Sequence, residues 1–510
     1  MIDIDTKNFE SLLELNKDMN KHEFDEISET KKIGIVYDYS TLSNENTLVG
    51  LKIAINMLSR LYSNIGIFSV NNEISQSEEE FLFKLSRSIR PTMHFFDCIQ
   101  ESDIIVNYTQ KNIDNKVSVF INSSNWDIEI GRNISDFVLD DSIPNPIAAC
   151  TAATLGVGEV FKEVFPKIKS EKLDYFRMSL FDYSDEIKKG PILTEVNIGE
   201  VLKVGIGAIG NAFIYGLSEL TNLSGKLILI DDEFIDNGNT QRYLLSNFQN
   251  INSCKVNVAR DFLSKSKCNV EVHRKKLGEY FYKSDRKSSI ENIVISVDNY
   301  ETRVHAQALL PKNIFNAYTG NNGQLGVTSH KFGDGPCLAC LYTHKNVEQS
   351  EIEEIADWLG VDIVFIGNIM INHSVGNKPI LTRELAEKIV LSSKKNLTLD
   401  DLEPFIAHEF RDFTTKAMCG GILLMSEEKI FNNTHSPICH QSVLSGLLLA
   451  NELIKFSISK NDFCNRKQIM LNVLYKPNLK YISREAFPKL KTCICTDPIY
   501  LDIYKKKYVL

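Results

Sequence analysis

The chain has 510 residues, of which 43% are hydrophobic and 24% are charged, so it is long enough for about two to four globular domains with large cores. Its net charge of −9 provides no dominant basic face and argues against nucleic-acid binding as the main role. The acidic, polar N-terminus is not expected to be a signal peptide, and no apolar run of membrane-spanning length stands out. The 11 cysteines are scattered, so we expect a reducing cytoplasm and no membrane attachment.

The first part of the chain is predicted to hold a Rossmann-like domain without a glycine loop. Residues 1–30 are polar and are expected to form an arm that is helical at most, and residues 167–198 form a charged connector. Between them, at 31–166, apolar periodicity predicts strands at 32–39, 65–70, 103–108 and 117–124 and helices at 47–62, 78–88 and 144–165. The sequence YDYSTLSNENT follows the first strand and contains no glycine, so we expect no phosphate-binding loop there.

The stretch from 201 to 242 organises the second part of the chain. Gly205, Gly207 and Gly210 form G-x-G-x-x-G directly after an apolar run, and an amphipathic helix follows. The next apolar strand, LILI, ends on Asp231, where a carboxylate can bond ribose hydroxyls. This order of strand, glycine turn, helix, strand and acid is typical of a nucleotide-binding βαβ unit.

Further polar residues follow successive strands of the same unit. Asn239 and Arg242 come after the second strand, and Lys255 opens the next helix. Cations that converge on a triphosphate stabilise the charge of its transition state. Asp298 ends a later strand, and its carboxylate can hold Mg²⁺.

The two parts are predicted to be a degenerate internal repeat. The strand at 103–108 corresponds to the strand at 292–299, and the apolar helix at 144–165 corresponds to the one at 440–458. The fold class is therefore α/β with two Rossmann-like halves, of which the C-terminal half keeps the phosphate chemistry. An ATP-binding domain is expected at 199–344 and 436–510, with a helical insertion at 345–435.

These motifs resemble those of the ThiF/MoeB and ubiquitin-activating-enzyme-like adenylyltransferases. The resemblance is carried by GIGAIG at 205–210, DDE at 231–233, GNTQRY at 238–243, Lys255, DNYETR at 298–303 and CLAC at 337–340. It implies that Asp231 bonds the ribose and that Asn239, Arg242 and Lys255 contact the phosphates. It also implies that Asp298 binds Mg²⁺ beside the reacting carboxylate. Glu233, Gly238 and Tyr243 depart from the family pattern without removing a charge that the mechanism needs.

The resemblance also implies a reaction and a role for the first half. Members activate a C-terminal carboxylate as an acyl-adenylate and borrow an arginine from a partner subunit. A non-catalytic first half can act as a built-in partner, with Arg60, Arg87, Arg90 and Arg132 as the arginines available. A fused pair of halves can work alone or pair again as a homodimer, and the sequence leaves both open.

Paired cysteines predict a structural metal. Cys337 and Cys340 form C-x-x-C, and Cys493 and Cys495 form C-x-C near the C-terminus. Four thiolates suit tetrahedral Zn²⁺, and the family has such a zinc. The short second pair leaves two alternatives, a different fourth ligand or a disulfide.

Two further cysteines are candidates for a thioester. Cys419 lies in the insertion in the sequence KAMCGGILL, where the adjacent glycines would leave its sulfur open to a bulky acyl-adenylate. Cys439 precedes His440, whose imidazole can favour a thiolate. Cys419 is the preferred candidate, while His344 and His373 are expected to be ordinary polar or packing residues.

The sequence thus predicts ATP-dependent adenylation of the C-terminal carboxylate of a ubiquitin-like protein or a precursor peptide, as in the microcin-type MccB-like relatives. Thioester formation or peptide modification would follow. The alternative is a non-catalytic module that binds a leader peptide. A dinucleotide oxidoreductase is the weaker rival, because Asn239, Arg242 and the cysteine pairs have no role in hydride transfer.

Overall fold

The structure is a computed structural model that describes residues 4–508 except for 39–43, 71–75, 110, 114–115, 140–142, 188–189, 284–289, 343–354, 357–358, 372–379, 394–397, 411–436, 460–466, 478, 480–482, 486–488 and 490–492. The chain divides into two compact units. The first unit joins residues 1–341 to 437–510, and the second comprises 342–436. The first unit contains both Rossmann-like halves.

The first half is a seven-stranded sheet of order β3-β2-β1-β4-β5-β6-β7. Its first five strands pair in parallel, and β6 and β7 add in antiparallel orientation. The strands are β1 Lys32–Tyr37, β2 Asn64–Ser69, β3 His94–Phe95, β4 Ile104–Asn107, β5 Val117–Ser124, β6 Asp127–Gly131 and β7 Tyr175–Ser179. The helices of this half are α1 Ile4–Leu15, α2 Lys21–Thr30, α3 Glu45–Leu61, α4 Gln76–Ile89 and α5 Pro146–Val164.

The second half repeats this architecture in an eight-stranded sheet of order β10-β9-β8-β11-β12-β13-β14-β15. Strands β8 to β12 are again parallel, and β13 to β15 are antiparallel. The strands are β8 Val196–Val204, β9 Leu223–Ile230, β10 Lys267–His273, β11 Asn292–Ile295, β12 Asn313–Thr319, β13 Gln324–Lys331, β14 Lys467–Asn472 and β15 Ser483–Glu485. The helices are α6 Ala208–Ser218, α7 Lys255–Phe262, α8 Leu277–Lys283, α9 Tyr300–Ala308, α10 Leu338–Tyr342, α16 Cys439–Ser459 and α18 Pro498–Tyr508.

The matching strand orders confirm the predicted α/β fold with two Rossmann-like halves. Corresponding helices even carry the same buried ion pair, Lys162 to Glu159 at 2.6 Å in α5 and Lys455 to Glu452 at 2.5 Å in α16. Each pair lies at i,i+3 on one helix face. The correspondence therefore extends from the sheets to single side chains.

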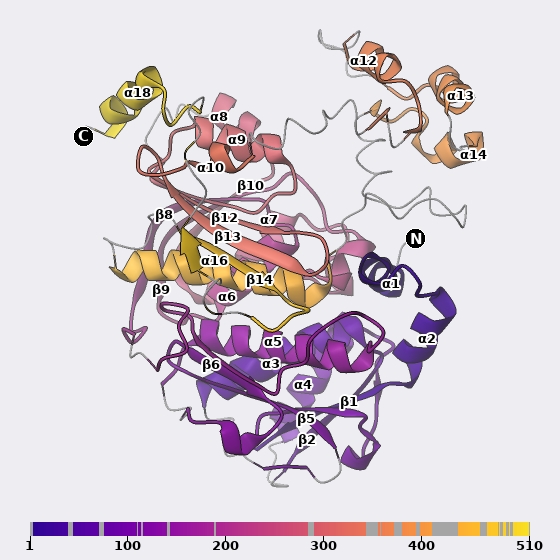
Figure 1. The fold of residues 1–510 in the computed structure, drawn as a ribbon, viewed down its shortest axis with the longest axis vertical. Helices are drawn as coiled ribbons and strands as arrows, with labels where there is room; N and C mark the ends of the chain where they lie inside the picture. The colour runs from indigo at the N-terminus through magenta and orange to yellow at the C-terminus, as the bar shows by residue number, and fades with distance from the viewer. Residues whose placement is uncertain are drawn as a thin grey trace. The chain divides into compact units, whose positions relative to one another are not determined.

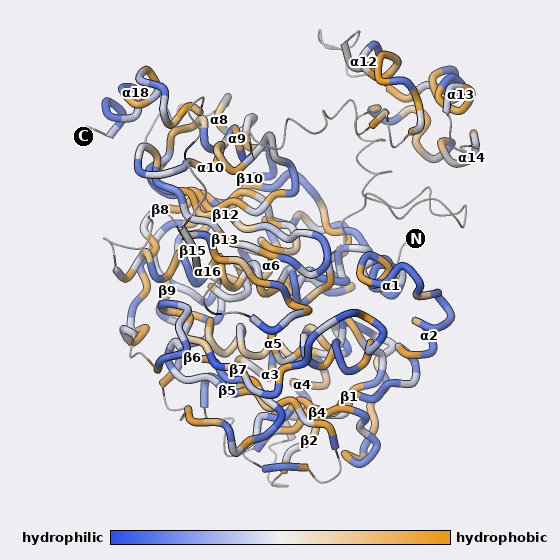
Figure 2. The backbone as a smooth tube through the Cα atoms, in the orientation of Figure 1, coloured by the Kyte–Doolittle hydropathy of each residue, from blue (hydrophilic) through white to orange (hydrophobic). Residues whose placement is uncertain are grey.

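Four helices form the layer between the two sheets: α3 and α5 from the first half, α6 and α16 from the second (Figure 1). The strands that flank this layer carry mostly apolar residues (orange in Figure 2). Gly446 of α16 sits so close to α6 that a Cβ there would lie 2.6 Å from the Ala212 Cβ. One continuous hydrophobic core therefore spans both halves.

Helix α16 is the one helix among the described residues that is long and apolar enough to cross a membrane by length and composition. Its most apolar window has a mean hydropathy of 1.2, and 78% of that window is buried within the fold. This helix differs from the expectation from sequence, in which no apolar run of that length stands out.

The start of α3, the helix that follows β1 in the first half, is packed against other parts of that half. The Asn46 side chain, in the first turn of α3, donates to the carbonyls of Ser123 and Ile143 at 3.2 and 2.9 Å and accepts from Asn145 N at 2.8 Å. Tyr108 covers the next turn, because a Cβ on Gly50 would lie 3.0 Å from its ring. Loss of phosphate binding in the first half stays a prediction, because residues 39–43 between β1 and α3 lie outside the described residues.

Two segments are more ordered than the sequence suggested. Residues 1–30 contain α1 and α2, whose Leu12, Leu13 and Phe24 are buried in the core. The stretch at 167–198, expected to be a connector, contains β7, which pairs with β6 and completes the first sheet. Both segments differ from the prediction for the same reason. Their buried apolar residues are few and alternate with polar residues that are also buried, so the apolar periodicity is weak.

The second unit has its own small core. It contains α12 Ile363–Ile371, α13 Arg383–Ser392 and α14 Leu399–Leu402. Leu359, Ile366 and Leu381 are among its fully buried residues. Its described part is helical, as expected of the insertion.

Candidate functional site

The candidate site lies at one edge of the second sheet. Strand β8 pairs in parallel with β9 on one side and with β11 on the other. The glycine loop, Asp231 and Asp298 follow the carboxyl ends of these three neighbouring strands. The chain leaves β8 towards β9 and later returns to β11, so this is the point where strand order reverses and ligands bind in such sheets.

The glycine loop needs its glycines for conformation and for space. Gly205 has φ +83°, and a Cβ there would lie 2.7 Å from the Ser296 carbonyl oxygen. A Cβ on Gly210 would collide with the Gly205 carbonyl. Gly207, the N-cap of α6, faces open space, with only the Tyr243 hydroxyl within 4 Å of an added Cβ. The loop therefore offers the helix N-terminus to a ligand, which suits an anion.

Asp231 is fixed by backbone donors. Its Oδ2 accepts from Ile206 N at 2.6 Å and its Oδ1 from Glu233 N at 3.0 Å. Burial raises the pKa of Asp231, although Lys255 and the two N–H donors oppose this shift. Each oxygen keeps a lone pair for a further donor such as a hydroxyl.

A buried lysine that the sequence reading did not single out lies beneath the loop. Lys203, the penultimate residue of β8, has no exposed surface. Its ammonium contacts the carbonyl oxygens of Val204 and Gly205 at 3.1 and 2.6 Å and the Ser296 hydroxyl at 2.5 Å. Burial lowers the pKa of Lys203 to about 7, with Asp231 opposing the shift.

Lys255 is a second lysine that interacts with Asp231. Its ammonium pairs with the Glu233 carboxylate and lies 5.2 Å from the centre of the Tyr243 ring. Burial alone would lower the pKa of Lys255, but Tyr243, Asp231 and Glu233 outweigh burial and raise it. Lys255 is thus cationic, and two of the departures from the family pattern, Glu233 and Tyr243, are its immediate partners.

Asn239 and Arg242 lie on the short helix η4, Asn237–Gln241, and at its C-terminal cap. Asn239 forms a capping box with Asp236: Asn239 N donates to Asp236 Oδ1 at 2.8 Å, and Asn239 Oδ1 accepts from Asp236 N at 3.1 Å. Arg242 is half-buried and donates to Gln241 Oε1 at 3.2 Å. The capping box stabilises the conformation of this turn. The Arg242 guanidinium has further N–H donors that a ligand can accept from.

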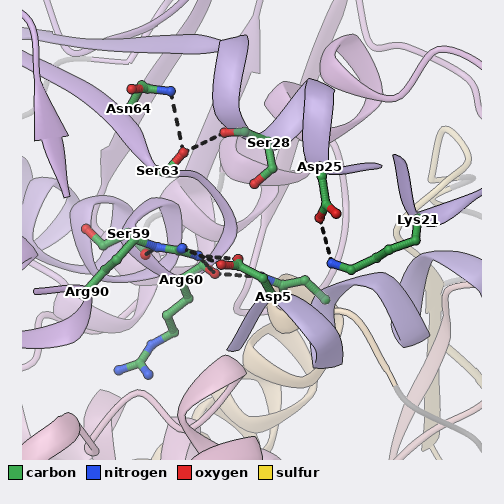
Figure 3. A network of polar contacts seen from close by, with 10 residues as sticks. Asp5, Lys21, Asp25, Ser28, Ser59, Arg60, Ser63, Asn64 and Arg90 are labelled. Atoms are coloured by element: carbon green, nitrogen blue, oxygen red, sulfur yellow. Dashed lines mark hydrogen bonds and ion pairs between the residues drawn. The ribbon is translucent and has the colours of Figure 1, made fainter. Parts of the chain in front are cut away.

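Arg60 of the first half holds this turn from beneath. It lies on α3, is fully buried, and donates to the carbonyls of Thr240, Leu244 and Ser246. Figure 3 shows its side chain extending away from Arg90, which pairs with Asp5 of α1 through two hydrogen bonds at 2.7 and 2.8 Å. Burial lowers the pKa of Arg60 to about 10.

The other three candidate arginines bond within their own half in the described part of the chain. Arg90 also donates to the carbonyls of Ser59 and Arg60. Arg132 pairs with Glu159 and Glu163, each at 3.1 Å. Arg87 lies 5.2 Å from the Phe95 ring centre. Arg60 is thus the one among the four whose guanidinium bonds to the second half.

Asp298 follows β11 and is exposed. No hydrogen bond or ion pair to it occurs within the described residues. An open carboxylate at this edge fits Mg²⁺, which keeps several waters and takes one or two protein carboxylates. The loop, Asp231 and Lys255 are directly linked by contacts, whereas Asp298 is placed near them by strand order.

The four cysteines Cys337, Cys340, Cys493 and Cys495 form one buried group. Their sulfur atoms all lie within 4.8 Å of one another, with 3.4 Å from Cys337 to Cys493 and 3.5 Å from Cys340 to Cys495. Tetrahedral zinc with Zn–S bonds near 2.3 Å requires sulfurs about 3.8 Å apart. The group fits such an ion, so the C-x-C spacing is no obstacle.

A buried chain of hydrogen bonds runs from the end of β11 to this group. Arg303 donates to Val297 O and to Asn316 Oδ1, the latter at 3.0 Å, and Asn316 donates to Thr328 Oγ1 at 3.1 Å. His330 Nε2 lies 2.9 Å from Thr328 Oγ1, and its Nδ1 lies 3.0 Å from the carbonyl of Pro336, next to Cys337. Burial lowers the pKa of His330 to about 4, so the ring is neutral and Nδ1 carries the proton.

The structure does not support Cys439 as a nucleophile. The thiol is fully buried, and burial raises its pKa to about 11, whereas a reactive cysteine needs a lowered pKa. His440 is buried too, and desolvation lowers its pKa to about 3. Cys419, His344 and His373 lie outside the described residues.

Three residues that support the site were not predicted in this role from the sequence: Lys203, Ser296 and Arg60. A charged residue inside the apolar strand VLKVGI was the available signal for Lys203. The sequence indicates Arg60 only as one of four available arginines. Its acceptors in the second half are backbone carbonyls, which every residue has, so no side-chain pattern predicts this contact.

Comparison with known proteins agrees with the motifs. The ThiF family matches residues 193–493. An uncharacterized protein y4jF from Sinorhizobium fredii is 26% identical over 502 residues, which cover 96% of this chain and 94% of that protein. The crystal structures of E. coli MccB with MccA-N7isoASN and with ATP are similar at 15% and 16% identity, with TM-scores of 0.35 and 0.34, over 59% and 58% of this chain and 67% of each MccB chain. Because the family match spans more than half of its residues, the chain belongs to the ThiF family.

Proposed function

We propose that the protein uses Mg-ATP to adenylate the C-terminal carboxylate of a peptide or small protein. The observation that carries the proposal is the joint placement of the glycine loop, Asp231, Lys255 and the Arg242 turn around the switch point of the second sheet. Membership of the ThiF family supports an adenylyltransferase. A site for hydride transfer would have no use for Lys255 and Arg242.

The reaction requires that the negative charge on the phosphates is stabilised and that the carboxylate is aligned with the α-phosphorus of ATP. A carboxylate oxygen of the substrate forms a bond to the α-phosphorus of ATP, and the bond to the bridging oxygen breaks, which releases pyrophosphate. No proton moves in this step. Asp231 would bond the ribose, the loop amides and α6 would hold phosphate oxygens, and Arg242, Asn239 and Lys255 would offset the charge that builds on the leaving group.

Asp298 would hold Mg²⁺ through its exposed carboxylate, and the ion would neutralise phosphate charge. Lys255 starts paired with Glu233, whose side chain is 67% exposed. A polyphosphate would compete with Glu233 for this ammonium, and Glu233 can turn into solvent. The site thus holds a cation ready without leaving a buried charge unpaired.

The first half would act as support for this site. The guanidinium of Arg60 is occupied by carbonyls of the second half, so it would shape the turn that carries Asn239 and Arg242. The four cysteines would hold a structural zinc that ties the C-terminal segment to the nucleotide domain.

The substrate would be a ubiquitin-like protein or a precursor peptide. ATP–pyrophosphate exchange with such substrates from the same genomic neighbourhood tests the proposal. Exchange is expected with the wild type and a loss of at least 100-fold with Asp298→Asn, while ATP binding persists. An absence of ATP binding by the wild type would refute adenylation and favour a leader-peptide-binding module.

The fate of the acyl group is tested separately. If it passes to a thiol, a thiol-sensitive adduct forms and disappears in Cys419→Ser but not in Cys439→Ser. If it does not, the acyl-adenylate is used directly for peptide modification.

A further inference from the structure

We propose that Lys203 is a positioning residue through which nucleotide binding at the glycine loop is coupled to the uptake of one proton. The proposal rests on ATP being the ligand of this site. Lys203 would touch neither substrate nor nucleotide. It would act through the peptide between Gly205 and Ile206.

The first step of the argument is the number of acceptors around the amine. The Lys203 nitrogen faces three oxygens, those of Val204, Gly205 and Ser296, at 3.1, 2.6 and 2.5 Å. An ammonium has three N–H donors and satisfies all three. A neutral amine has two donors, so the Ser296 hydroxyl would have to turn its proton towards the amine and give up its bond to the Gly205 carbonyl. The observed set of hydrogen bonds therefore favours the charged form.

The second step is what the amine holds in place. The Gly205 carbonyl accepts from Lys203 and also from the Ser296 hydroxyl at 3.1 Å. The N–H on the other side of the same peptide belongs to Ile206 and donates to Asp231 at 2.6 Å. Both ends of one peptide unit are fixed, so loss of the Lys203 proton would loosen the loop and the ribose-binding carboxylate together.

The third step is the cost of keeping the charge. Asp231, at the end of β9, favours the ammonium, and Arg303, on α9, opposes it. The Phe213 ring of α6 lies 5.5 Å away and favours it weakly, and Ser296 of the β11 end contributes only its hydroxyl. Burial dominates and lowers the pKa of Lys203 to about 7. Near neutral pH the free protein is therefore divided between the two forms.

A bound polyphosphate brings negative charge next to this group and favours the ammonium. By linkage, whatever raises the proton affinity on binding also makes binding weaker as pH rises. With a starting pKa near 7 that rises on binding, the dissociation constant for ATP is expected to rise by up to about tenfold between pH 6 and pH 8.

The test is titration calorimetry of the full-length protein with Mg-ATP and no peptide, at pH 6 and pH 8 and in buffers of different ionisation enthalpy. We expect the wild type to lose up to about tenfold in affinity over this range and to take up as much as one proton at pH 8. Lys203→Met should lose both the pH dependence and the proton uptake. Lys203→Arg, which stays charged, should keep the pH 6 affinity at pH 8.

Two further variants separate this role from a structural one. Lys226→Met removes a lysine of β9 that pairs with Glu200 and Glu271, and it should behave as the wild type. Ser296→Ala removes one acceptor and should move the midpoint of the pH profile to lower pH, which keeps the test valid if Lys203→Met does not fold. ATP binding by the wild type with no pH dependence beyond that of Lys203→Met would overturn the proposal and leave the adenylation function intact. No ATP binding at any pH would overturn both.

Discussion

Replacement of Arg60 by methionine tests whether the first half shapes the nucleotide site. Methionine keeps the aliphatic volume and removes the guanidinium. In the wild type that group donates to Asn56 Oδ1 at 2.9 Å and to the carbonyls of Thr240, Leu244 and Ser246. All of these acceptors are buried, and the variant removes this donor from each of them, although the Leu244 carbonyl keeps the Asn56 amide as a donor at 3.1 Å.

The magnitude follows from these bonds. A hydrogen bond from a charged donor contributes about 1.5–3 kcal/mol, and three cross-half carbonyls would give roughly 5–9 kcal/mol in total. Burial of the guanidinium charge offsets part of this stabilisation, and the same burial lowers the pKa of Arg60. We therefore expect Arg60→Met to reduce the free energy of unfolding by about 3–5 kcal/mol, which is what remains of the hydrogen-bond contribution after this offset.

Urea unfolding of the nucleotide domain measures the loss, and hydrogen exchange across residues 240–246 measures the loosening of the turn. Affinity for ATP should fall as well, because the turn carries Asn239 and Arg242. Arg87→Met is the matched control, since Arg87 is exposed and contacts only the Phe95 ring in the described part of the chain. It should change stability by less than about 0.5 kcal/mol. A change below about 1 kcal/mol in Arg60→Met, with unaltered exchange at 240–246, would refute the reasoning.

Three other predictions concern the loop, the metal and pH. Gly205→Ala should weaken ATP binding at least tenfold, because its φ of +83° and the Ser296 carbonyl leave no room for a Cβ. Gly278→Ala, with open space around it, should bind ATP normally. Titration calorimetry measures the affinity of both variants. Titration of the thiols with a mercurial should release one zinc per chain and lower the midpoint of thermal unfolding. Cys337→Ser should already lack the metal. Cys98→Ser, which replaces an exposed cysteine, should retain it. The wild type should lose stability as pH falls from about 6.5 towards 3, because unfolded His440 takes up a proton that the buried ring, with its pKa lowered to about 3, refuses. Denaturant midpoints at pH 5 and 7.5 should differ less in His440→Phe, and an equal difference would exclude this cause.

The sequence was sufficient for features whose cause is local. A glycine with positive φ at a helix start, an acid at the end of the next strand and a C-x-x-C turn each constrain neighbouring residues, so Gly205, Asp231 and Cys337 could be named with their surroundings. The repeat of strand order was predictable for the same reason, because each βα unit carries its own apolar pattern.

Features that depend on distant partners could not be predicted. Lys203 bonds to Ser296, which is 93 residues away in the sequence. The sequence of the strand VLKVGI does not predict that partner. Helix α1 was underestimated because Asn8 and Ser11 occupy its buried stripe beside Leu12. Asn8 is accommodated only because its side chain donates to the Arg60 carbonyl at 2.7 Å.

The four-helix layer between the halves has a consequence for stoichiometry and dilution. Two separate subunits that met through such a layer would dissociate as their concentration fell. Here α3 and α16 belong to one chain, so the local concentration of each half around the other is set by the connecting segment and not by the amount of protein in solution. The Arg60 contact therefore persists at any dilution. The two sides of the layer also change independently, since a substitution in one half is not copied into the other.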